Sequence, residues 1–274
     1  MIGSVVVLYK PTKEEIENIN VYLSDIDYAV IVDNSDENNE ELVTSTIQKK
    51  NKIFYYSEQT NLGLCKGMNI GVRLLEEKDC DWALLFDADS KPCSNIVSVY
   101  KKAIEKYKGN DVAVFTPVHV FERSKNKPYH GYKNVNWSMT SGWCINVDIF
   151  KKQNGFFEEL FVDGLDMDYC FKSNENGHEI IECGEAIIKH HPAETKSFLK
   201  IKYGVASPYR YYMQARQLVW CWKRYHRLEL LFIYMYKWFK VLILFPMKRE
   251  YIRNMIQGTR AGVSLLRSYK ANGK

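Results

Sequence analysis

The chain has 274 residues, of which 46% are apolar and 26% are charged, and its 38 Lys and Arg against 33 Asp and Glu give a formal charge of +5. This composition predicts one large or two small globular domains, and it excludes a disordered chain, a collagen-like repeat and a small disulfide scaffold. Seven scattered cysteines without a Cys-x-x-Cys pair favour reduced thiols over a metal or disulfide framework.

The charge is divided unevenly along the chain. Residues 1–195 hold 21 basic and 31 acidic side chains, a net −10, whereas residues 196–274 hold 17 basic and 2 acidic ones, a net +15. We therefore expect two parts, a first domain over 1–195 and a basic, aromatic-rich helical region over 196–274.

Short apolar runs alternate with helix-like stretches in the first half of the chain. The expected strands are Ser4–Tyr9, Tyr28–Val32, Lys52–Tyr56, Trp82–Phe86 and Val112–Thr116. The expected helices between them are Lys13–Leu23, Glu40–Lys49, Cys65–Glu77 and Ile96–Tyr107. This alternation predicts an α/β fold with a mostly parallel central sheet, whose ligands bind beyond the carboxyl ends of the strands.

The remaining part of the first domain has a weaker pattern. Residues 117–138 look irregular and polar, and Trp137–Val147 reads as a return to the sheet. A helix ending at Asn176 and strands over His178–Glu182 and Ala186–Lys189 complete the domain. Beyond about residue 196 the pattern becomes helical.

The segment WALLFDADS ends a buried strand with Asp87 and Asp89. Carboxylates two residues apart on extended backbone point the same way, and such a pair suits Mg²⁺ or Mn²⁺ carrying the oxygens of a diphosphate. A solvated turn is the alternative for an isolated Asp-x-Asp. The position directly after an apolar strand favours the metal.

Two further strand ends point to the same edge. Asp33 follows the second strand, where its carboxylate could accept a hydrogen bond from a pyrimidine base or merely cap a turn. Asn61 begins the Asn-Leu-Gly segment after the third strand, which suits either a nucleotide contact or an ordinary helix start. Their convergence on one edge favours a nucleotide site.

A second acidic cluster, FVDGLDMDYC, holds Asp163, Asp166 and Asp168. Acids at this position complement the positive end of a helix, and one of them can also act as a general base on a sugar hydroxyl. Asp166 is our candidate base. Further on, His190 and His191 end a strand, and a neutral imidazole there could complete a carboxylate-bound metal site.

Taken in order, several segments resemble the inverting family-two glycosyltransferases of GT-A fold. They are VVVLYKP, IVDNSD, NLGLCKGMNIG, LLFDADS, TSG, FVDGLDMDYCFKSNENGHEI, KHHPAE and SPYRYYMQARQ, and the resemblance covers roughly residues 4–220. Within that family the chain is most similar to bacterial rhamnosyltransferases of surface-polysaccharide assembly. The resemblance implies a Rossmann-like nucleotide-diphospho-sugar transferase domain over 1–195 with a C-terminal helical extension.

The resemblance also implies roles for individual residues. Tyr9, Asp33 and Asn61 would lie around the nucleotide, and Asp87 and Asp89 would hold Mg²⁺ or Mn²⁺ on the diphosphate. Asp166 matches the catalytic base. The residues expected near the donor and acceptor are Thr140, Ser141, Gly142 and Asp163.

Some positions depart from the family pattern. His190 matches a histidine that contacts the metal or phosphate, but Pro-Ala-Glu follows His191, so the choice between the two histidines stays open. Leu165 stands where some relatives have an acid, and Asp168 stands where Glu is frequent.

The implied reaction moves a sugar from a nucleotide diphosphate to a hydroxyl of a growing bacterial surface glycan, with inversion at the anomeric carbon. We favour dTDP-rhamnose as donor, and UDP-galactofuranose, UDP-glucose or UDP-galactose are the alternatives. The acceptor would be a glycan or a lipid-diphosphate-linked glycan. A nucleotidyltransferase, an inactive carbohydrate-binding scaffold and a non-catalytic nucleic-acid-binding protein are the competing interpretations, and we expect no nucleic acid as partner.

The basic region supplies the membrane hypothesis. Arg216, Trp220, Lys223 and Arg227 share one face at helical spacing, and an apolar stripe comprises Leu228, Leu231, Phe232, Met235, Phe239 and Leu242. Glu229, Lys237 and Lys240 interrupt the apolar stretch, so we expect no membrane-spanning helix. Either the stripe packs in a core, or it attaches a cytoplasmic enzyme to the anionic inner face of the cell membrane.

Overall fold

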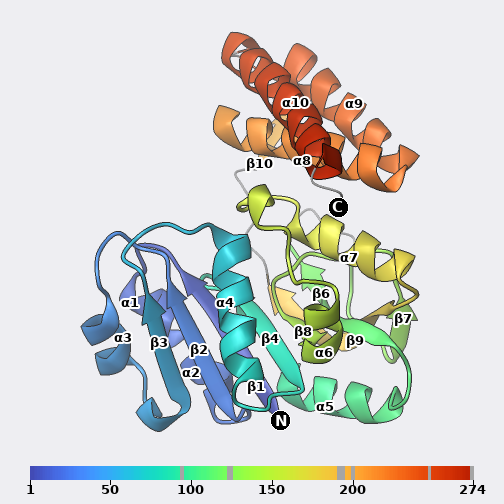
Figure 1. The fold of residues 1–274 in the computed structure, drawn as a ribbon. Coiled ribbons are helices and arrows are strands. Elements are labelled where there is room, and N and C mark those ends of the chain that lie inside the picture. The colour runs from blue at the N-terminus through green and yellow to red at the C-terminus, as the bar shows by residue number, and fades with distance from the viewer. Residues whose placement is uncertain (93–95, 122–125, 190–194, 199–200, 246–247, 272–274) are drawn as a thin grey trace. The chain divides into compact units, whose positions relative to one another are not determined.

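The computed structural model describes residues 1–92, 96–121, 126–189, 195–198, 201–245 and 248–271. The chain divides into two compact units, 1–190 and 191–274. The first is an α/β unit around a central sheet, and the second is mainly helical (Figure 1).

The strands of the first unit are β1 (Ile2–Leu8), β2 (Tyr28–Asp33), β3 (Ile53–Ser57), β4 (Trp82–Asp87), β5 (Lys91–Pro92), β6 (Val112–Val120), β7 (Tyr132–Asn134), β8 (Trp143–Asn146) and β9 (Glu179–Lys189). Its helices are α1 (Lys13–Glu17), α2 (Asn20–Leu23), α3 (Glu40–Thr46), α4 (Leu64–Glu76), α5 (Ile96–Lys106), α6 (Val147–Lys152) and α7 (Leu165–Glu175), with short 3₁₀ turns η1 (Lys50–Lys52) and η2 (Glu158–Leu160).

The sheet has the order β3-β2-β1-β4-β8-β6-β9-β5, with β7 paired to β9. Strands β1 to β4 are parallel to one another, as the βα alternation predicts. Strand β8 is inserted antiparallel between β4 and β6, so the sheet as a whole is mixed. The carboxyl ends of the first four strands therefore meet at one edge, and β8 begins at that same edge.

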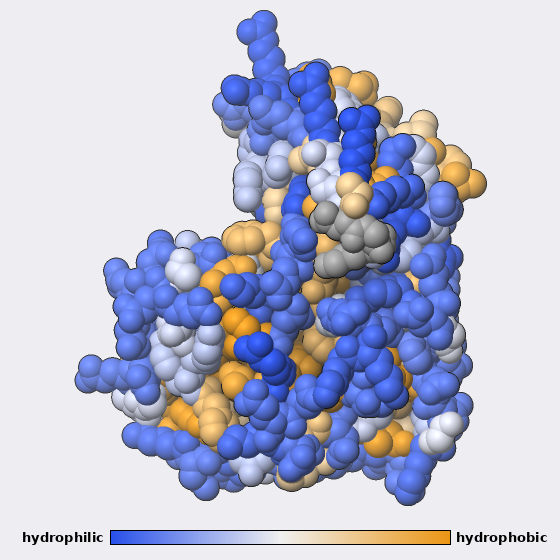
Figure 2. Space-filling model, viewed as in Figure 1, coloured by the Kyte–Doolittle hydropathy of each residue, from blue (hydrophilic) through white to orange (hydrophobic). Residues whose placement is uncertain are grey.

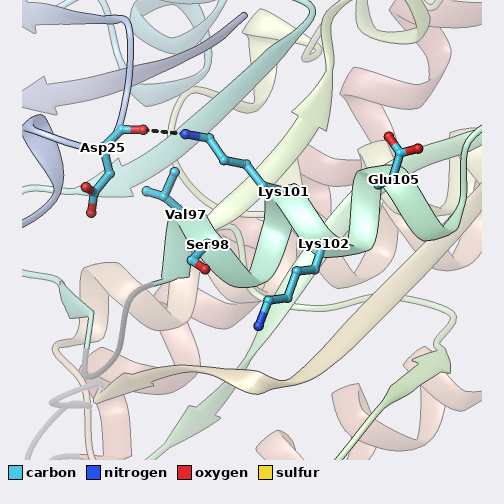
Figure 3. A pocket seen from close by; sticks show the side chains of 6 residues that line it. All are labelled: Asp25, Val97, Ser98, Lys101, Lys102 and Glu105. Carbon is cyan, nitrogen blue, oxygen red and sulfur yellow. Dashed lines mark hydrogen bonds between the residues drawn. The ribbon is translucent and has the colours of Figure 1, made fainter.

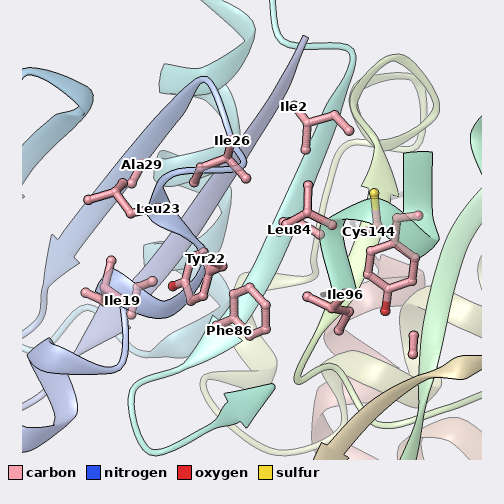
Figure 4. Close-up of a cluster of buried hydrophobic side chains, with 14 of the residues drawn as sticks. Ile2, Ile19, Tyr22, Leu23, Ile26, Ala29, Leu84, Phe86, Ile96 and Cys144 are labelled. Atoms are coloured by element: carbon pink, nitrogen blue, oxygen red, sulfur yellow. The ribbon is translucent and has the colours of Figure 1, made fainter. Parts of the chain in front are cut away.

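Strand β1 is buried on both faces, which explains its continuous apolar sequence. On one face Val5 and Val7 lie under α4, where Gly71 and Gly67 leave room for their methyl groups. On the other face Val6 and Leu8 join a large core cluster with side chains from α1, α2 and α5 (Figure 4). Helices thus cover both faces of the sheet.

Several elements of the first unit differ from the sequence expectation. Strands β5 and β7 and helix α6 were not predicted, and β7 lies within residues 117–138, which we expected to be irregular. The predicted helix over Lys13–Leu23 is two short helices, α1 and α2. Strand β6 runs to Val120, beyond the predicted end at Thr116, because Pro117 sits at a register shift against β9, where a strand tolerates proline. The same shift lets the two predicted strands after His178 run as a single strand, β9.

The second unit begins with a hairpin that the sequence analysis did not predict. Strands β10 (Thr195–Phe198) and β11 (Ile201–Gly204) pair antiparallel where we expected the helical pattern to begin. Three helices follow, α8 (Pro208–Tyr225), α9 (Leu228–Leu244) and α10 (Lys248–Ala271). In the described parts of the chain, no helix is both long and apolar enough to cross a bilayer.

Helices α8 and α10 pack closely and run parallel. Gly258 lies against the Tyr212 backbone, Gly262 against the Arg216 backbone, and the rings of Trp220 and Tyr269 meet edge to face at 5.2 Å. Helix α9 connects them and runs antiparallel to both, with Lys237 donating to Gln214 at 2.8 Å.

The basic and aromatic face predicted over Arg216–Arg227 is not one helical surface. His226 adopts a left-handed conformation with φ 53° and ends α8, so Arg227 belongs to the start of α9. Trp220 is completely buried, and the Arg224 guanidinium lies over its ring and over the ring of Tyr269. The predicted face is absent because α8 ends before Arg227 and because Trp220 and Arg224 pack against Tyr269 inside the unit.

Candidate active site

Asp87 and Asp89 lie where the sequence placed them, at the carboxyl end of β4. Asp87 pairs in register with Val7 of β1, and the Ser90 N–H donates to the Asp87 carbonyl at 3.0 Å to close a turn. The Asn18 side-chain amide donates to the Ala88 carbonyl at 3.3 Å and braces this turn. Asp87 is half-buried and Asp89 is exposed, so the Asp-Ala-Asp turn is open to solvent beyond the strand.

Asp33 ends β2 beside Leu8 of β1, and its carboxylate is buried within its own loop. It accepts hydrogen bonds from Ser35 N–H at 2.9 Å, the Tyr55 hydroxyl at 2.6 Å and the Asn39 amide at 2.9 Å. Burial would raise the pKa of this carboxyl, but the donors Ser35, Tyr55 and Asn39 outweigh it and hold the pKa below its usual value. Asp33 is therefore an ionised acceptor that shapes the turn, and its contact with a base stays a prediction.

Asn61 shapes the turn between β3 and α4. Its Oδ1 accepts from the Gly63 N–H at 2.9 Å, while the Gly63 carbonyl accepts from the buried Asn34 amide at 3.0 Å. Gly63 has φ 81°, and a Cβ on it would lie 2.8 Å from the Phe161 carbonyl oxygen. Glycine is required at this position on both counts, and the turn ties β3 and α4 to residue 161.

Phe161 is a strained residue that leads into the acidic cluster. Its φ of 69° and ψ of −62° place it at the centre of a rare γ-turn, closed by the Val162 N–H donating to the Leu160 carbonyl at 2.9 Å. The Phe161 carbonyl accepts from the Cys65 N–H of α4 at 3.1 Å. The strain is held by contacts at the edge where the other candidate residues lie.

Asp163 and Asp166 flank the start of α7, with Asp166 in its first turn. The Asp166 Oδ1 accepts from the Met167 N–H at 2.8 Å. Burial raises the pKa of Asp166 to about 6; the Asp163 carboxylate adds to the rise and the Met167 N–H opposes it. A carboxyl group with this pKa is ionised at neutral pH and still basic enough to take a proton, which suits a general base.

The segment Thr140, Ser141 and Gly142 is buried and firmly held at the same edge. Gly142 N–H donates to the Leu85 carbonyl of β4 at 2.7 Å, and the Tyr100 hydroxyl donates to the Gly142 carbonyl. The Ser141 hydroxyl contacts the Ser90 hydroxyl, directly after the Asp-Ala-Asp turn. This hydrogen bond links the predicted metal-binding turn to the predicted donor and acceptor segment.

Sequence reasoning missed three residues of this region. Ser90 and Phe161 make the contacts described above, and the buried His119 Nε2 donates to the Ser141 carbonyl at 2.8 Å. The alternation Val118-His-Val120 is a strand signal that could have placed His119 on β6. Nothing in the sequence indicates the positive φ of Phe161.

The remaining predicted residues are Tyr9 and the two histidines. Tyr9 follows β1 and is 51% exposed at the carboxyl edge. His190 and His191 lie outside the described residues. The residue before them, Lys189, pairs with Lys91, which follows Asp89 by two positions.

Asp87 and Asp89 could supply part of the coordination sphere of a divalent cation. Asp87 and Asp89 supply hard oxygen ligands on an open turn, and Mg²⁺ or Mn²⁺ takes its remaining ligands from water and substrate phosphates. The described residues contain no group of three or more His, Cys, Asp or Glu side chains that could hold a metal ion by themselves. A cation here would need the diphosphate oxygens to complete its coordination.

Two surface hollows lie apart from these residues. One, of about 490 Å³, lies beside α5 and is lined in part by Asp25, Lys101 and Glu105 (Figure 3). Lys101 donates there to the Asp25 carbonyl at 2.9 Å. The other, of about 340 Å³, lies between α4 and α6. Neither is lined by a residue predicted for the site.

The fold is shared with solved glycosyltransferases. The chain superposes on GalNAc-T7 with UDP, GalNAc and Mn²⁺ at a TM-score of 0.60 and 12% identity, covering 93% of this chain and 54% of that one. It is similar to residues 1–349 of TarS from S. aureus at 0.56 and 16%, covering 97% and 83%. It is also similar to the mannosyltransferase PcManGT from Pyrobaculum calidifontis with GDP-Man and Mn²⁺ at 0.56 and 13%, covering 81% and 63%. These likenesses confirm the predicted GT-A fold.

Sequence comparison gives the family. The model of glycosyl transferase family 2 matches residues 12–170, more than half of the chain, and the chain belongs to this family. A curated relative, the dTDP-rhamnosyl transferase RfbF of Shigella flexneri, is 25% identical over 62% of this chain. The chain spans 62% of the length of that relative. The predicted membership of the family-two glycosyltransferases is thus confirmed.

The hydrogen-bonded segment at Gly142 gives a testable prediction. Gly142 has φ 80°, and a Cβ on it would fall on the Ile188 side chain and 3.0 Å from Pro117 Cγ. Gly142→Ala should therefore lower the free energy of unfolding by strain of about 1–2 kcal/mol and by crowding of a further ~1–3 kcal/mol. Urea unfolding measures the sum.

Gly177→Ala is the matched control. Gly177 has φ 82° with nothing within 4 Å of the added Cβ, so this variant should show the strain without the crowding. If both variants lose the same free energy of unfolding, the segment at Gly142 accommodates the added methyl group without crowding, which contradicts the tight packing against Ile188 and Pro117.

Proposed function

We propose that this chain transfers a sugar from a nucleotide-diphosphate donor to a glycan hydroxyl, with inversion of configuration. One observation carries the proposal: a carboxyl group whose pKa is raised to about 6, Asp166, in a family-two glycosyltransferase fold. The Asp-Ala-Asp turn and the segment Thr140–Gly142 lie at the same edge, joined through Ser90 and Ser141. This edge offers both a diphosphate site and a base.

The proposed chemistry assigns a distinct task to each part of the edge. Asp166 takes the proton of the acceptor hydroxyl while that oxygen attacks the anomeric carbon from the face opposite the nucleotide. A divalent cation held by Asp87 and Asp89, with His190 or His191 as a further ligand, would stabilise the negative charge on the leaving diphosphate. Asn61, Tyr9 and Asp33 would surround the nucleotide.

A single displacement fixes the stereochemistry of the product. A β-linked dTDP-rhamnose donor would give an α-rhamnoside, and an α-linked UDP-sugar would give a β product. We favour dTDP-rhamnose because the curated relative is a dTDP-rhamnosyl transferase. UDP-galactofuranose, UDP-glucose and UDP-galactose are the alternative donors.

The acceptor we propose is a growing bacterial surface glycan on a lipid diphosphate, so the enzyme would act at the cytoplasmic face of the cell membrane. The basic second region supports this, since residues 196–274 carry a net +15 and the inner leaflet is anionic. Membership of a glycosyltransferase family favours this function over nucleotidyl transfer, a carbohydrate-binding scaffold or nucleic-acid binding.

Replacing the base gives the most direct test of mechanism. Asp166→Asn should lower the rate of nucleoside diphosphate release by about 10²–10⁴-fold, because the amide cannot accept the proton. Donor affinity, measured by calorimetry, should change little. A variant that keeps a near-normal rate would remove Asp166 from its role.

The pH profile tests the same group without deleting it. Because Asp166 must be ionised to act, the rate should fall as the pH drops through about 6. Asp163→Asn removes a negative charge that raises the pKa of Asp166, so the acid limb should move to lower pH. A limb that stays in place would mean that another group titrates.

Removal of the proposed cation ligands should affect donor binding. Calorimetry with dTDP-rhamnose and Mn²⁺ should show weaker donor binding by Asp87→Asn and Asp89→Asn than by the parent. Chelation of Mn²⁺ should lower the donor affinity of the parent and leave that of the two variants unchanged. The control is Asp79→Asn, at an exposed position after α4. If chelation leaves the parent affinity unchanged, donor binding is metal-independent.

A donor panel tests substrate and reaction class together. We expect dTDP-rhamnose to give the largest release of nucleoside diphosphate, ahead of UDP-galactofuranose, UDP-glucose and UDP-galactose. Release of pyrophosphate instead would identify a nucleotidyltransferase. A salt-sensitive shift of an oligonucleotide without donor binding would favour the nucleic-acid interpretation.

A further inference from the structure

Among the described residues of the second unit, the outer face of α9 is the largest run of exposed apolar side chains. It comprises Leu228, Phe232, Met235, Tyr236, Phe239, Leu242 and Ile243, each between 47% and 68% exposed. At 3.6 residues per turn these seven fall within about 120° of arc along the whole helix. Figure 2 shows apolar residues gathered on the side of this unit where Figure 1 shows α9.

The opposite face of α9 is also apolar and is already used. Leu230 and Val241 are fully buried there, and Val241 belongs to the cluster around Tyr211 and Met255. A helix that is apolar on both faces is normally covered on both. The outer face of α9 therefore has the composition of a covered surface.

Helix α10 carries a line of four exposed arginines, Arg249, Arg253, Arg260 and Arg267. At 3.6 residues per turn they lie within about 40° of arc. The two acidic side chains of the region leave most of this arginine line without an acidic neighbour. Glu229 lies 4.0 Å from Arg227, and Glu250 stands three residues before Arg253 only, the other three arginines having no acid three or four residues away on α10.

The arginine line and the outer face of α9 turn to the same side. Tyr234 bonds to Thr259 and the Phe245 ring meets the Tyr251 ring, so α9 and α10 run antiparallel with Thr259 facing α9. Going around α9 from this contact, on the side away from α8, one reaches the apolar face. Going around α10 from the same contact, also away from α8, one passes Ile256, which is 39% exposed, and reaches the arginines.

We propose that the outer face of α9 and the arginine line of α10 form one membrane-binding surface for anionic phospholipid. The apolar side chains enter the boundary between headgroups and acyl chains, and the arginines contact lipid phosphates. Phe232, Tyr236 and Phe239 are the aromatic anchors of this surface. The proposal deepens the proposed function, on which it rests only for placing the acceptor at a membrane.

Charge favours lipid over a second copy of the chain. Residues 196–274 contain 17 basic and 2 acidic side chains, so a second copy that met this surface with the same surface of its own would bring like charges to the arginine line and few partners for them. An anionic lipid surface supplies the missing negative charge together with an apolar phase.

Vesicle co-sedimentation of the full chain tests this surface. Vesicles of phosphatidylcholine with phosphatidylglycerol should bind the protein, phosphatidylcholine vesicles should bind it much less, and 1 M salt should release it, because the Debye length falls to about 3 Å. Arg253→Gln with Arg260→Gln should weaken partitioning to the anionic vesicles by about 25-fold, about fivefold for each arginine.

The apolar part is tested by Phe232→Asn with Phe239→Asn, which should reduce partitioning by roughly tenfold or more. Val21→Asn is the matched control, since Val21 is 59% exposed on α2. The proposal is overturned if the double Phe variant binds vesicles like the parent. It is also overturned if light scattering without lipid shows a dimer that this variant converts to monomers, because a second copy then covers α9.

Activity on a soluble acceptor separates this surface from the proposed function. The double Phe variant should keep the parent's rate of transfer to such an acceptor while losing vesicle binding. If vesicle binding behaves as expected but the parent transfers no sugar, the surface stands and the proposed function fails.

Discussion

The arrangement of the candidate site depends on the pairing of β1 with both of its neighbours. Leu8 pairs with Asp33 of β2 and Val7 pairs with Asp87 of β4, so the two carboxylates flank the end of a single strand. This register is fixed because β1 buries both faces, and a slip by one residue would exchange Val5 and Val7 with Val6 and Leu8. The apolar packing of β1 thereby determines where the polar edge lies.

The carboxylates at this edge differ in their hydrogen bonding and in their proton affinity. Asp33 already accepts from three neighbours, which keeps its carboxylate ionised and its orientation fixed. Asp166 is desolvated and has a like charge nearby, so its proton affinity is increased. The same residue type is therefore held ionised at one strand end and has a raised proton affinity at the start of α7, where we propose that it acts as a base. The difference lies in the number of donors that the backbone and neighbouring side chains supply.

Much of this architecture could be predicted from the sequence because β1 to β4 are continuous apolar runs bounded by polar turns. The positions of Asp33, Asn61 and Asp87 relative to strand and helix ends follow from that pattern. What sequence reasoning missed has local causes. We predicted that this strand ends at Thr116, yet a register shift accommodates Pro117 and carries His119 to the edge. The strain at Phe161 depends on a long-range contact with Cys65, which no short segment reveals.

The parallel pairing of α8 with α10 has a consequence for how the second unit assembles. The two helices that pack most closely are separated along the chain by α9, so the buried rings of Tyr211 and Trp220 are covered only after α10 has been synthesised. Until then the ribosome-bound chain presents α8 and both apolar faces of α9 together. Closure of this unit therefore has to wait for α10, and it leaves the outer face of α9 exposed.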